Sequence, residues 1–242
     1  MTPGAGREPR AVPSGRALIW FGEAIRLWKR GPAAFSLMAL VVIVAILLPT
    51  AIPVVGFVAA NVVAPLLACG LLFGSLAADR GEPVRFPQLF MVFAAPVPLQ
   101  FAVVAAALVA ALVESALAWW IAGVNLLAPG SDAVNLTAST QVIIFATEVL
   151  VSLPFTFVPM AALFDGERPR AAFASSLRAF GRNPQAMLVL GAYMFVLVLA
   201  GVATMGIGLV LGLPWIAAAQ YAAWKDIYGV TASGGGTPGE VA

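Results

Sequence analysis

Three long stretches of the chain contain no Asp, Glu, Lys or Arg, and they limit the fold more than any other feature. They cover residues 31–78, 86–113 and 183–224, which are 48, 28 and 42 residues long. A helix needs about 20 apolar residues to cross a bilayer. Because 62% of the residues are apolar and only 10% are charged, unlike a soluble domain, we predict an all-α fold: a polytopic membrane helical bundle.

Proline and glycine divide these stretches into six transmembrane helices. Pro49 and Pro53 mark a turn in the first stretch, and the segment from Gly201 to Gly206 divides the last one. The predicted spans cover residues 33–48, 56–78, 97–121, 141–164, 185–203 and 206–224.

The six spans belong to a single membrane domain that covers residues 16–229. Residues 1–15 and 230–242 are polar and rich in Gly, and we expect both segments to be disordered. Gly70 to Gly74 and Gly208 to Gly212 match the GxxxG pattern, which allows close helix contact. We expect these contacts within the bundle rather than at a dimer face.

All 13 basic residues fall on one side of this arrangement. Six precede the first span, two lie between the second and third, four lie between the fourth and fifth, and one follows the sixth. Under the positive-inside rule, both termini are therefore cytoplasmic.

Two segments outside the spans are amphipathic, residues 16–30 and 170–182. Each ends at a proline bend, Gly31-Pro32 in the first case and Asn183-Pro184 in the second. We expect both helices to lie in the plane of the bilayer. The aromatic residues of the first are expected among the lipid headgroups: Trp20, Phe21 and Trp28.

In the second amphipathic segment the apolar residues form a stripe, Phe173, Leu177 and Phe180. Polar residues such as Ser175 and Arg178 lie opposite this stripe, as the 100° helical period requires.

The pattern of surface helix, proline bend and two-span hairpin occurs three times, with a weaker copy at 86–96. Each hairpin ends at an acidic residue: Asp79, Asp165 or Asp226. We interpret this as a threefold hairpin pseudo-repeat about an axis along the membrane normal. The alternative is that basic segments followed by proline recur by chance before inserted spans.

Three short motifs carry a resemblance to a known family. They are the Arg-x-aromatic-x-Arg-Asn-Pro bend at 178–184, the Asp-Gly-Glu-Arg-Pro turn at 165–169 and the closing Tyr-Ala-Ala-Trp-Lys-Asp-Ile-Tyr-Gly at 221–229. Over about residues 12–229 the chain resembles an uncharacterised proteobacterial family of six-span inner-membrane proteins. It is more distantly similar to the membrane domain of glycerophosphodiester phosphodiesterases. The resemblance implies a bacterial inner-membrane location and brings no activity or catalytic residue.

Only two ionisable residues lie within the predicted spans, Glu114 and Glu148. Because the third and fourth spans are antiparallel, the two carboxylates are expected at one level of the outer leaflet. Two close carboxylates can share a proton or hold a cation, which makes them a candidate ligand or proton site. Alternatively, each is protonated, extends to the interface or bonds a neighbouring helix.

Seven basic residues beside the membrane are candidates for contact with lipid phosphates. They are Arg26, Lys29, Arg30, Arg168, Arg170, Arg178 and Arg182. The alternative is that they only fix the topology.

The composition excludes several kinds of chemistry. The chain has no His and a single Cys, Cys69, so His-based catalysis, an internal disulfide and CxxC motifs are absent. It has no nucleotide-binding or hydrolase motif. We therefore expect no enzyme activity, no catalytic residue, no cofactor, no metal and no nucleic-acid partner.

The remaining expectation is a non-enzymatic membrane protein that acts as a scaffold, assembly factor or regulatory partner of other membrane components. The alternative is a small-solute or lipid transporter that uses Glu114 and Glu148. The expected partners are the lipid bilayer and other membrane proteins, and the sequence leaves the oligomeric state open.

Overall fold

The computed structural model describes residues 7–47, 56, 59–123 and 137–230, and these residues contain helices and no strands. Residues 1–6 and 231–242 of the predicted disordered ends lie outside this range, and so do Pro49 and Pro53. Residues 7–15 lie within it, and Arg10 and Val12 are held by tertiary hydrogen bonds rather than disordered. The elements are α1 Arg16–Trp28, α2 Pro32–Leu47, η2 Ala59–Val63, α4 Ala64–Asp79, η3 Phe86–Ala94, α5 Val97–Ala122, α6 Ala138–Ser152, η5 Leu153–Phe155, α7 Val158–Leu163, α8 Pro169–Arg182, α9 Pro184–Ala203 and α10 Leu209–Ile227.

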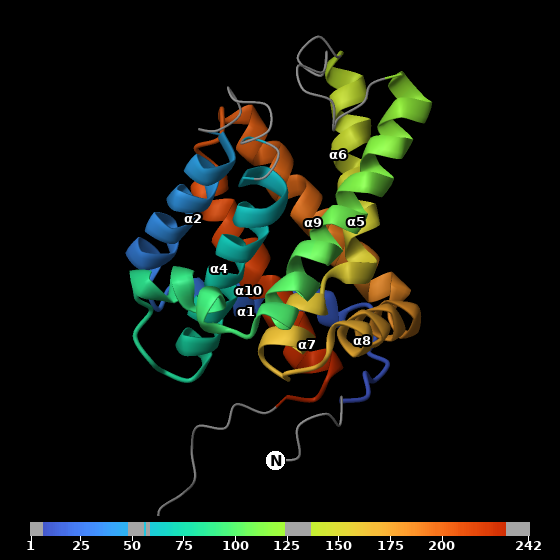
Figure 1. The fold of residues 1–242 in the computed structure, drawn as a ribbon. Helices are drawn as coiled ribbons and strands as arrows, with labels where there is room; N and C mark the ends of the chain where they lie inside the picture. The colour runs from blue at the N-terminus through green and yellow to red at the C-terminus, as the bar shows by residue number, and fades with distance from the viewer. Residues whose placement is uncertain (1–6, 48–55, 57–58, 124–136, 231–242) are drawn as a thin grey trace, which may run out of the picture.

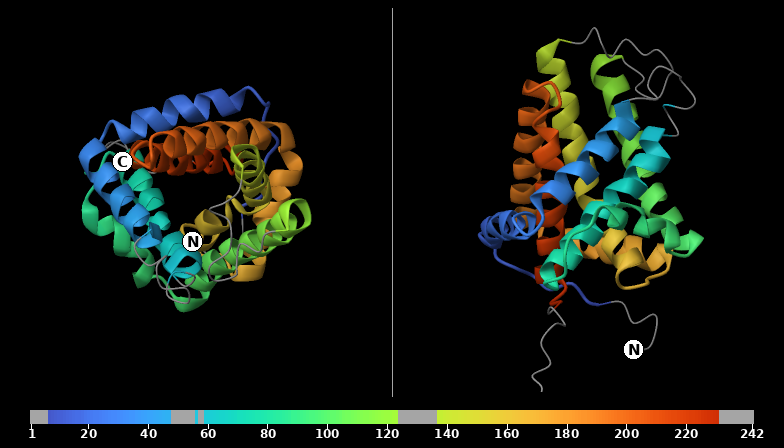
Figure 2. Two further views of the ribbon diagram at one scale, coloured as in Figure 1. Left: turned by 90° about the horizontal axis from the view of Figure 1, so that it is seen from above. Right: turned by 90° about the vertical axis from the view of Figure 1, so that its left-hand side faces the viewer.

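The long helices run side by side, and shorter ones lie across one end of them (Figures 1 and 2). Helices α2, α4, α9 and α10 form one group, while α5 and α6 pair as a hairpin whose upper part extends away from that group. Helices α1 and α8 lie across the lower end in Figure 1. The described chain ends also lie there, so this end gathers segments that are distant in sequence.

Four helical segments of the described chain are long and apolar enough to cross a membrane. They are Asn61–Asp79, Val97–Ile121, Ser139–Leu163 and Pro184–Ala203. The pair α1 and α2, which is bent by 102°, would make a fifth. Helix α10 is long enough but less apolar than these segments and is not among them, because its second half includes Gln220, Lys225 and Asp226. The predicted helical fold is thus confirmed with four or five helices that could cross a membrane.

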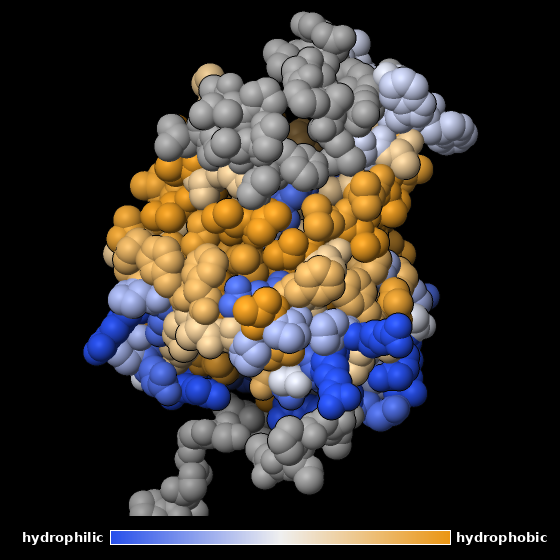
Figure 3. All heavy atoms as spheres, viewed as in Figure 1, coloured by the Kyte–Doolittle hydropathy of each residue, from blue (hydrophilic) through white to orange (hydrophobic). Residues whose placement is uncertain are grey.

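Side chains are sorted along the long axis of the molecule. On the face in Figure 3, apolar residues form a belt across the middle, and hydrophilic residues gather at the lower end. This is the distribution expected of a protein surrounded by hydrocarbon at the belt and by water at the charged end. We call the lower end the charged end.

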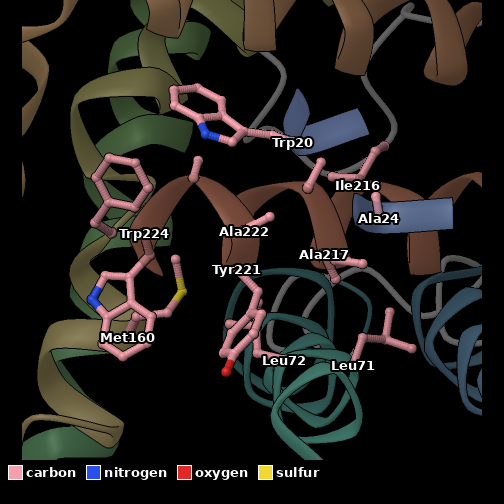
Figure 4. Packing of buried hydrophobic residues seen from close by; sticks show 14 of the residues in the cluster. Trp20, Ala24, Leu71, Leu72, Met160, Ile216, Ala217, Tyr221, Ala222 and Trp224 are labelled. Carbon is pink, nitrogen blue, oxygen red and sulfur yellow. The ribbon is translucent and has the colours of Figure 1, made fainter. Parts of the chain in front are cut away.

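Helix α10 forms the centre of the packing. It contacts α1, α2, α4 and α9, and Figure 4 shows it between α1 and α4. Small side chains allow this close approach, since Ala217, Ala218, Ala219 and Ala223 are all buried. Tyr221 is buried with them, so α10 brings large and small residues together in the core.

Helix α1 matches the predicted amphipathic segment, but its aromatic residues do not face the headgroups. Trp20 is 2% exposed and packs in the core. Phe21 stacks on Tyr193, with ring centroids 3.9 Å apart. The apolar residues exposed from α1 are instead Leu18, Ile19 and Ile25. The prediction was wrong because bilayer and core are both apolar, so periodicity alone cannot tell which of them a residue faces.

Helix α8 gives a similar correction. Its fully buried side consists of small residues, Ala172, Ser175, Ser176 and Ala179, whereas Leu177 of the predicted stripe is exposed. Ser176 Oγ donates to the Pro154 carbonyl at 2.7 Å and accepts from the Phe157 amide at 3.1 Å. These bonds satisfy backbone groups at the break between η5 and α7.

Candidate functional site

The hairpin of α5 and α6 holds both intramembrane glutamates. Glu114 precedes Ala122, the end of α5, by about 12 Å, and Glu148 follows Ala138, the start of α6, by about 15 Å, at 1.5 Å per residue. The two antiparallel helices therefore place the carboxylates at nearly one level. They are near enough for a direct electrostatic interaction, which is repulsive when both are ionised.

The segments that carry the two glutamates are less buried than the segment with α4, as is the segment with α9. Glu114 is partly buried, whereas Glu148 is exposed on the surface of α6. Within the apolar window of each span, 28% of α5 and 33% of the segment with α6 are buried, against 61% of the segment with α4. An ionised carboxylate facing hydrocarbon is unfavourable by at least a few kcal/mol. Glu148 therefore needs a proton or a partner group, and its role stays a prediction.

A cavity of about 250 Å³ lies between the helices in the apolar part of the molecule. Its walls come from α4, α5, the α6–η5 segment, α7 and α10. The polar side chains among them include Ser152, Thr156 and Gln220. Gln220 Nε2 has a weak contact with Met194 Sδ at 3.8 Å, so this amide retains capacity for a hydrogen bond.

At the charged end, the aspartates of the three hairpins each meet cations. A negative charge at the C-terminal end of a helix opposes the helix dipole. Asp79, the last residue of α4, accepts from Lys225 Nζ at 2.6 Å and from Tyr221 Oη at 3.0 Å. Arg26 Nη2 lies 3.6 Å from its other oxygen. These contacts join the ends of α4, α10 and α1.

Asp226 has a still fuller set of donors. Its Oδ2 accepts from Arg16 Nε at 2.8 Å and from Trp20 Nε1 at 3.0 Å, and its Oδ1 accepts from Arg10 Nη2 at 2.8 Å. Burial alone would raise the pKa of this carboxyl, but the three hydrogen bonds outweigh it and hold the pKa below its ordinary value. Asp226 is therefore an ionised anchor for α1 and the N-terminal segment.

The third aspartate lies beside a glutamate that has no hydrogen-bonding partner. Asp165 Oδ1 is 3.6 Å from Arg7 Nη1. Glu167 is 4% exposed, and within the described chain neither of its carboxylate oxygens accepts a hydrogen bond. Burial and the neighbouring charge of Asp165 raise the pKa of Glu167, although Arg178 opposes this shift. When both carboxylates are ionised, Asp165 and Glu167 repel each other, which disfavours the folded state.

The seven candidate lipid-phosphate contacts divide into two groups. Arg26 pairs with Glu23 and Asp79, Arg30 donates to the Ala78 carbonyl, and Arg182 donates to the Pro9 carbonyl. The other four are exposed, and their side chains form no hydrogen bond or ion pair within the described chain: Lys29, Arg168, Arg170 and Arg178. Only this second group remains available to lipid headgroups.

The sequence pattern does not reveal the residues that hold the charged end together. The three aspartates were visible as a recurring motif, but their cationic partners lie up to 216 residues away in the chain.

Cys69 is buried, and its Sγ contacts the Pro65 carbonyl oxygen at 3.3 Å. No group of three or more His, Cys, Asp or Glu side chains in the described chain could hold a metal ion.

Comparison with known proteins gives no relative. No family model, curated protein or solved structure matches this chain.

Proposed function

We propose that this chain is a non-enzymatic integral membrane protein that binds another membrane protein through its α5–α6 hairpin, as a scaffold, assembly factor or regulatory subunit. The observation that carries this proposal is Glu148, an acidic residue exposed on a hairpin that extends from the bundle. Exposed apolar residues such as Leu112 and Leu150 lie along the same hairpin. This combination favours a protein partner over lipid as the neighbour of α6.

The energetics of helix association in membranes support this proposal. Apolar surface alone does not drive helices together in lipid, because lipid tails are equally apolar. Packing and polar contacts between helices drive the association instead. A charged side chain near the centre of a membrane helix is unfavourable by about 3 kcal/mol when it faces lipid. A donor on a partner helix would offset that cost at Glu148.

The test is substitution of Glu148 by Leu, followed by extraction from the native membrane into nanodiscs. Wild-type protein should carry a stoichiometric membrane partner, and Glu148→Leu should lose it while its thermal midpoint stays equal or rises. Val196→Ala on α9, where the wild-type residue is also exposed, serves as the matched control and should keep the partner. Retention of the partner by Glu148→Leu would overturn the proposal.

The six-span topology is part of the proposal, with α2 and α10 as the first and last crossings and α1 and α8 in the membrane plane. The sorting of hydrophilic residues to one end supports it, and so does the 102° bend between α1 and α2. In this arrangement both termini are cytoplasmic, in the inner membrane of a bacterium as the family resemblance implies.

Single cysteines test this topology after Cys69→Ala removes the native thiol. Cysteines at Ser14, Arg168 and Val230 should react with impermeant reagent from one side of the membrane, and a cysteine at Thr137 from the other. Labelling of Val230 from the side of Thr137 would show that α10 does not cross.

The helix ends at the charged end support the threefold pseudo-repeat. After α4, the Glu82 amide donates to the Ala77 carbonyl at 2.9 Å, and after α10 the Val230 amide donates to the Lys225 carbonyl at 2.8 Å. Both six-to-one bonds close around a glycine with positive φ. The turn at Gly166 also has a positive φ but a wider closure.

A second candidate function, the handling of a lipid or small solute, is favoured by the apolar cavity. Its volume of about 250 Å³ and its weakly paired Gln220 suit an acyl chain with a polar end. Ala106→Trp, which should fill the cavity, would then abolish binding of a brominated lipid measured by tryptophan quenching. Unchanged quenching would contradict this function.

A further inference from the structure

The segment Arg7–Val12 crosses the charged end in a non-helical conformation before α1 begins. We call it the N-terminal strap. It contacts the α8–α9 junction on one side and the end of α10 on the other, through residues more than 170 positions away in the chain. The strap is therefore held by tertiary contacts rather than by local structure.

Much of this contact is recognition of the peptide backbone. The side-chain amide of Asn183 accepts from the Val12 amide at 2.7 Å and donates to the Arg10 carbonyl at 3.0 Å. The Arg10 amide donates to the Ile227 carbonyl at 2.8 Å. Arg182 donates to the Pro9 carbonyl. Such contacts require an extended chain but little particular sequence, as in peptide-binding grooves.

The strap covers a surface formed by Asn183, Arg182, Asp165 and the end of α10, which we call the groove. This surface is organised by contacts that do not involve the strap. Asn183 is 3% exposed, and its Nδ2 also donates to the Ala179 carbonyl at 3.0 Å. Arg16 and Trp20 of α1 donate to Asp226, so its carboxylate stays in place without Arg10. Preorganised groups of this kind lower the entropic cost of binding.

Charge gives the groove its selectivity. Asp226 binds the Arg10 guanidinium, and Arg10 Nε also donates to the Asp226 carbonyl at 2.7 Å. At the other end of the strap, Asp165 faces Arg7 at 3.6 Å. The side chains of Asp226 and Asp165 thus recognise two arginines, Arg10 and Arg7, that are three residues apart in the strap.

We propose that this groove, formed by Asn183, Arg182, Asp165 and the end of α10, is a docking site for an extended, arginine-bearing segment of a partner protein, and that the N-terminal strap occupies it in cis. A tethered occupant has a high effective concentration. The strap therefore prevents weakly binding basic peptides from occupying the groove. Only a partner that binds more tightly, or at several sites at once, displaces it. This surface is separate from the α5–α6 hairpin.

The experiment uses the full-length protein in nanodiscs of phosphatidylcholine, which limits nonspecific adsorption of basic peptide. The probe is a fluorescent peptide of residues 5–14. Arg7→Ala/Arg10→Ala in the protein weakens the cis strap, and this variant should bind the probe about tenfold or more tightly than wild-type protein does. Equal binding by both proteins, or binding by neither, would overturn the proposal.

Two matched controls test whether the groove is the site. A probe that carries Ala at both arginine positions should bind the weakened variant about tenfold less tightly. Adding Asn183→Ala to that variant should also abolish binding, with unchanged size-exclusion elution as evidence of folding. Equal binding of both probes would overturn the proposal even if Asn183→Ala fails to fold. Partner capture through the hairpin is measured separately, so the two proposals can fail independently.

Discussion

The ammonium of Lys225 lies 2.6 Å from Oδ2 of Asp79, which joins the end of α10 to the end of α4. The Asp79 side chain is 4% exposed, and Tyr221 donates to the same oxygen at 3.0 Å. These two polar contacts fix the relative height of α4 and α10. Apolar packing tolerates sliding, whereas a buried ion pair specifies one register.

Asp79→Ala should therefore be among the more destabilising substitutions at the charged end. The Lys225 ammonium, which is largely buried, would lose its carboxylate partner. Loss of one partner of a buried ion pair typically costs about 3 kcal/mol of stability. The measurement is the thermal midpoint in detergent. Asp79→Ala combined with Lys225→Met should recover part of the loss, and a double variant less stable than Asp79→Ala would contradict this reading.

Glu167→Gln should stabilise the protein at neutral pH. Because the folded-state pKa of Glu167 is raised by burial and by Asp165, ionisation penalises the folded state. That penalty is absent below the ordinary pKa of Glu and grows as the pH rises through the folded value. We expect a gain of about 1 kcal/mol at pH 8 and none at pH 4, measured by thermal unfolding. If Glu167→Gln changed the stability equally at pH 4 and pH 8, Glu167 would not be a buried, unpaired carboxylate.

The strap should stay bound over the ordinary pH range and be released only in acid. Because the Asp226 pKa is lowered in the folded protein, its contribution is present above the ordinary Asp value and is lost as the pH falls through the folded value. Spin labels at Ala11 and Gly181, in a Cys69→Ala background, should report one narrow distance distribution from pH 5 to 8. Asp226→Asn should broaden it at pH 7, and a distribution unaffected by that change would count against the anchor.

Gly70→Ala should destabilise the contact between α4 and η3. A Cβ at this position would lie 2.4 Å from the Leu89 Cα, and backbone cannot yield as a flexible side chain can. We expect a loss of about 1–3 kcal/mol, measured by thermal unfolding. Gly22→Ala on α1 meets no atom within 4 Å and should be neutral or stabilising, so equal losses at both sites would refute the close-packing explanation.

The sequence predicted the helical elements well, because charge, proline and glycine bound them. The expected spans 97–121 and 185–203 correspond to α5 Val97–Ala122 and α9 Pro184–Ala203. Residues 16–30 likewise contain α1. The close contact expected at Gly70 is also within the bundle, against η3. The positions of the helix ends depend on nearby charged, proline and glycine residues, which can be located in the sequence without knowledge of tertiary contacts.

Which face each helix buries could not be predicted in the same way. In a membrane protein the core and the surroundings are both apolar, so the exposed Leu177 and the buried Ser175 of α8 reverse the usual expectation. The groove around Asn183 was missed for a different reason. Its occupant lies 171 residues away, and only tertiary structure brings the two together.

The most direct test of the partner-binding function is site-specific photocrosslinking in the native membrane. A photoreactive residue replaces Leu150 on α6 or, as the matched control, Val196 on α9; these wild-type residues are 54% and 60% exposed. The proposal predicts one discrete protein adduct from position 150, which weakens with Glu148→Leu, and none from position 196. Absence of an adduct at position 150, or equal adducts at both positions, would contradict it.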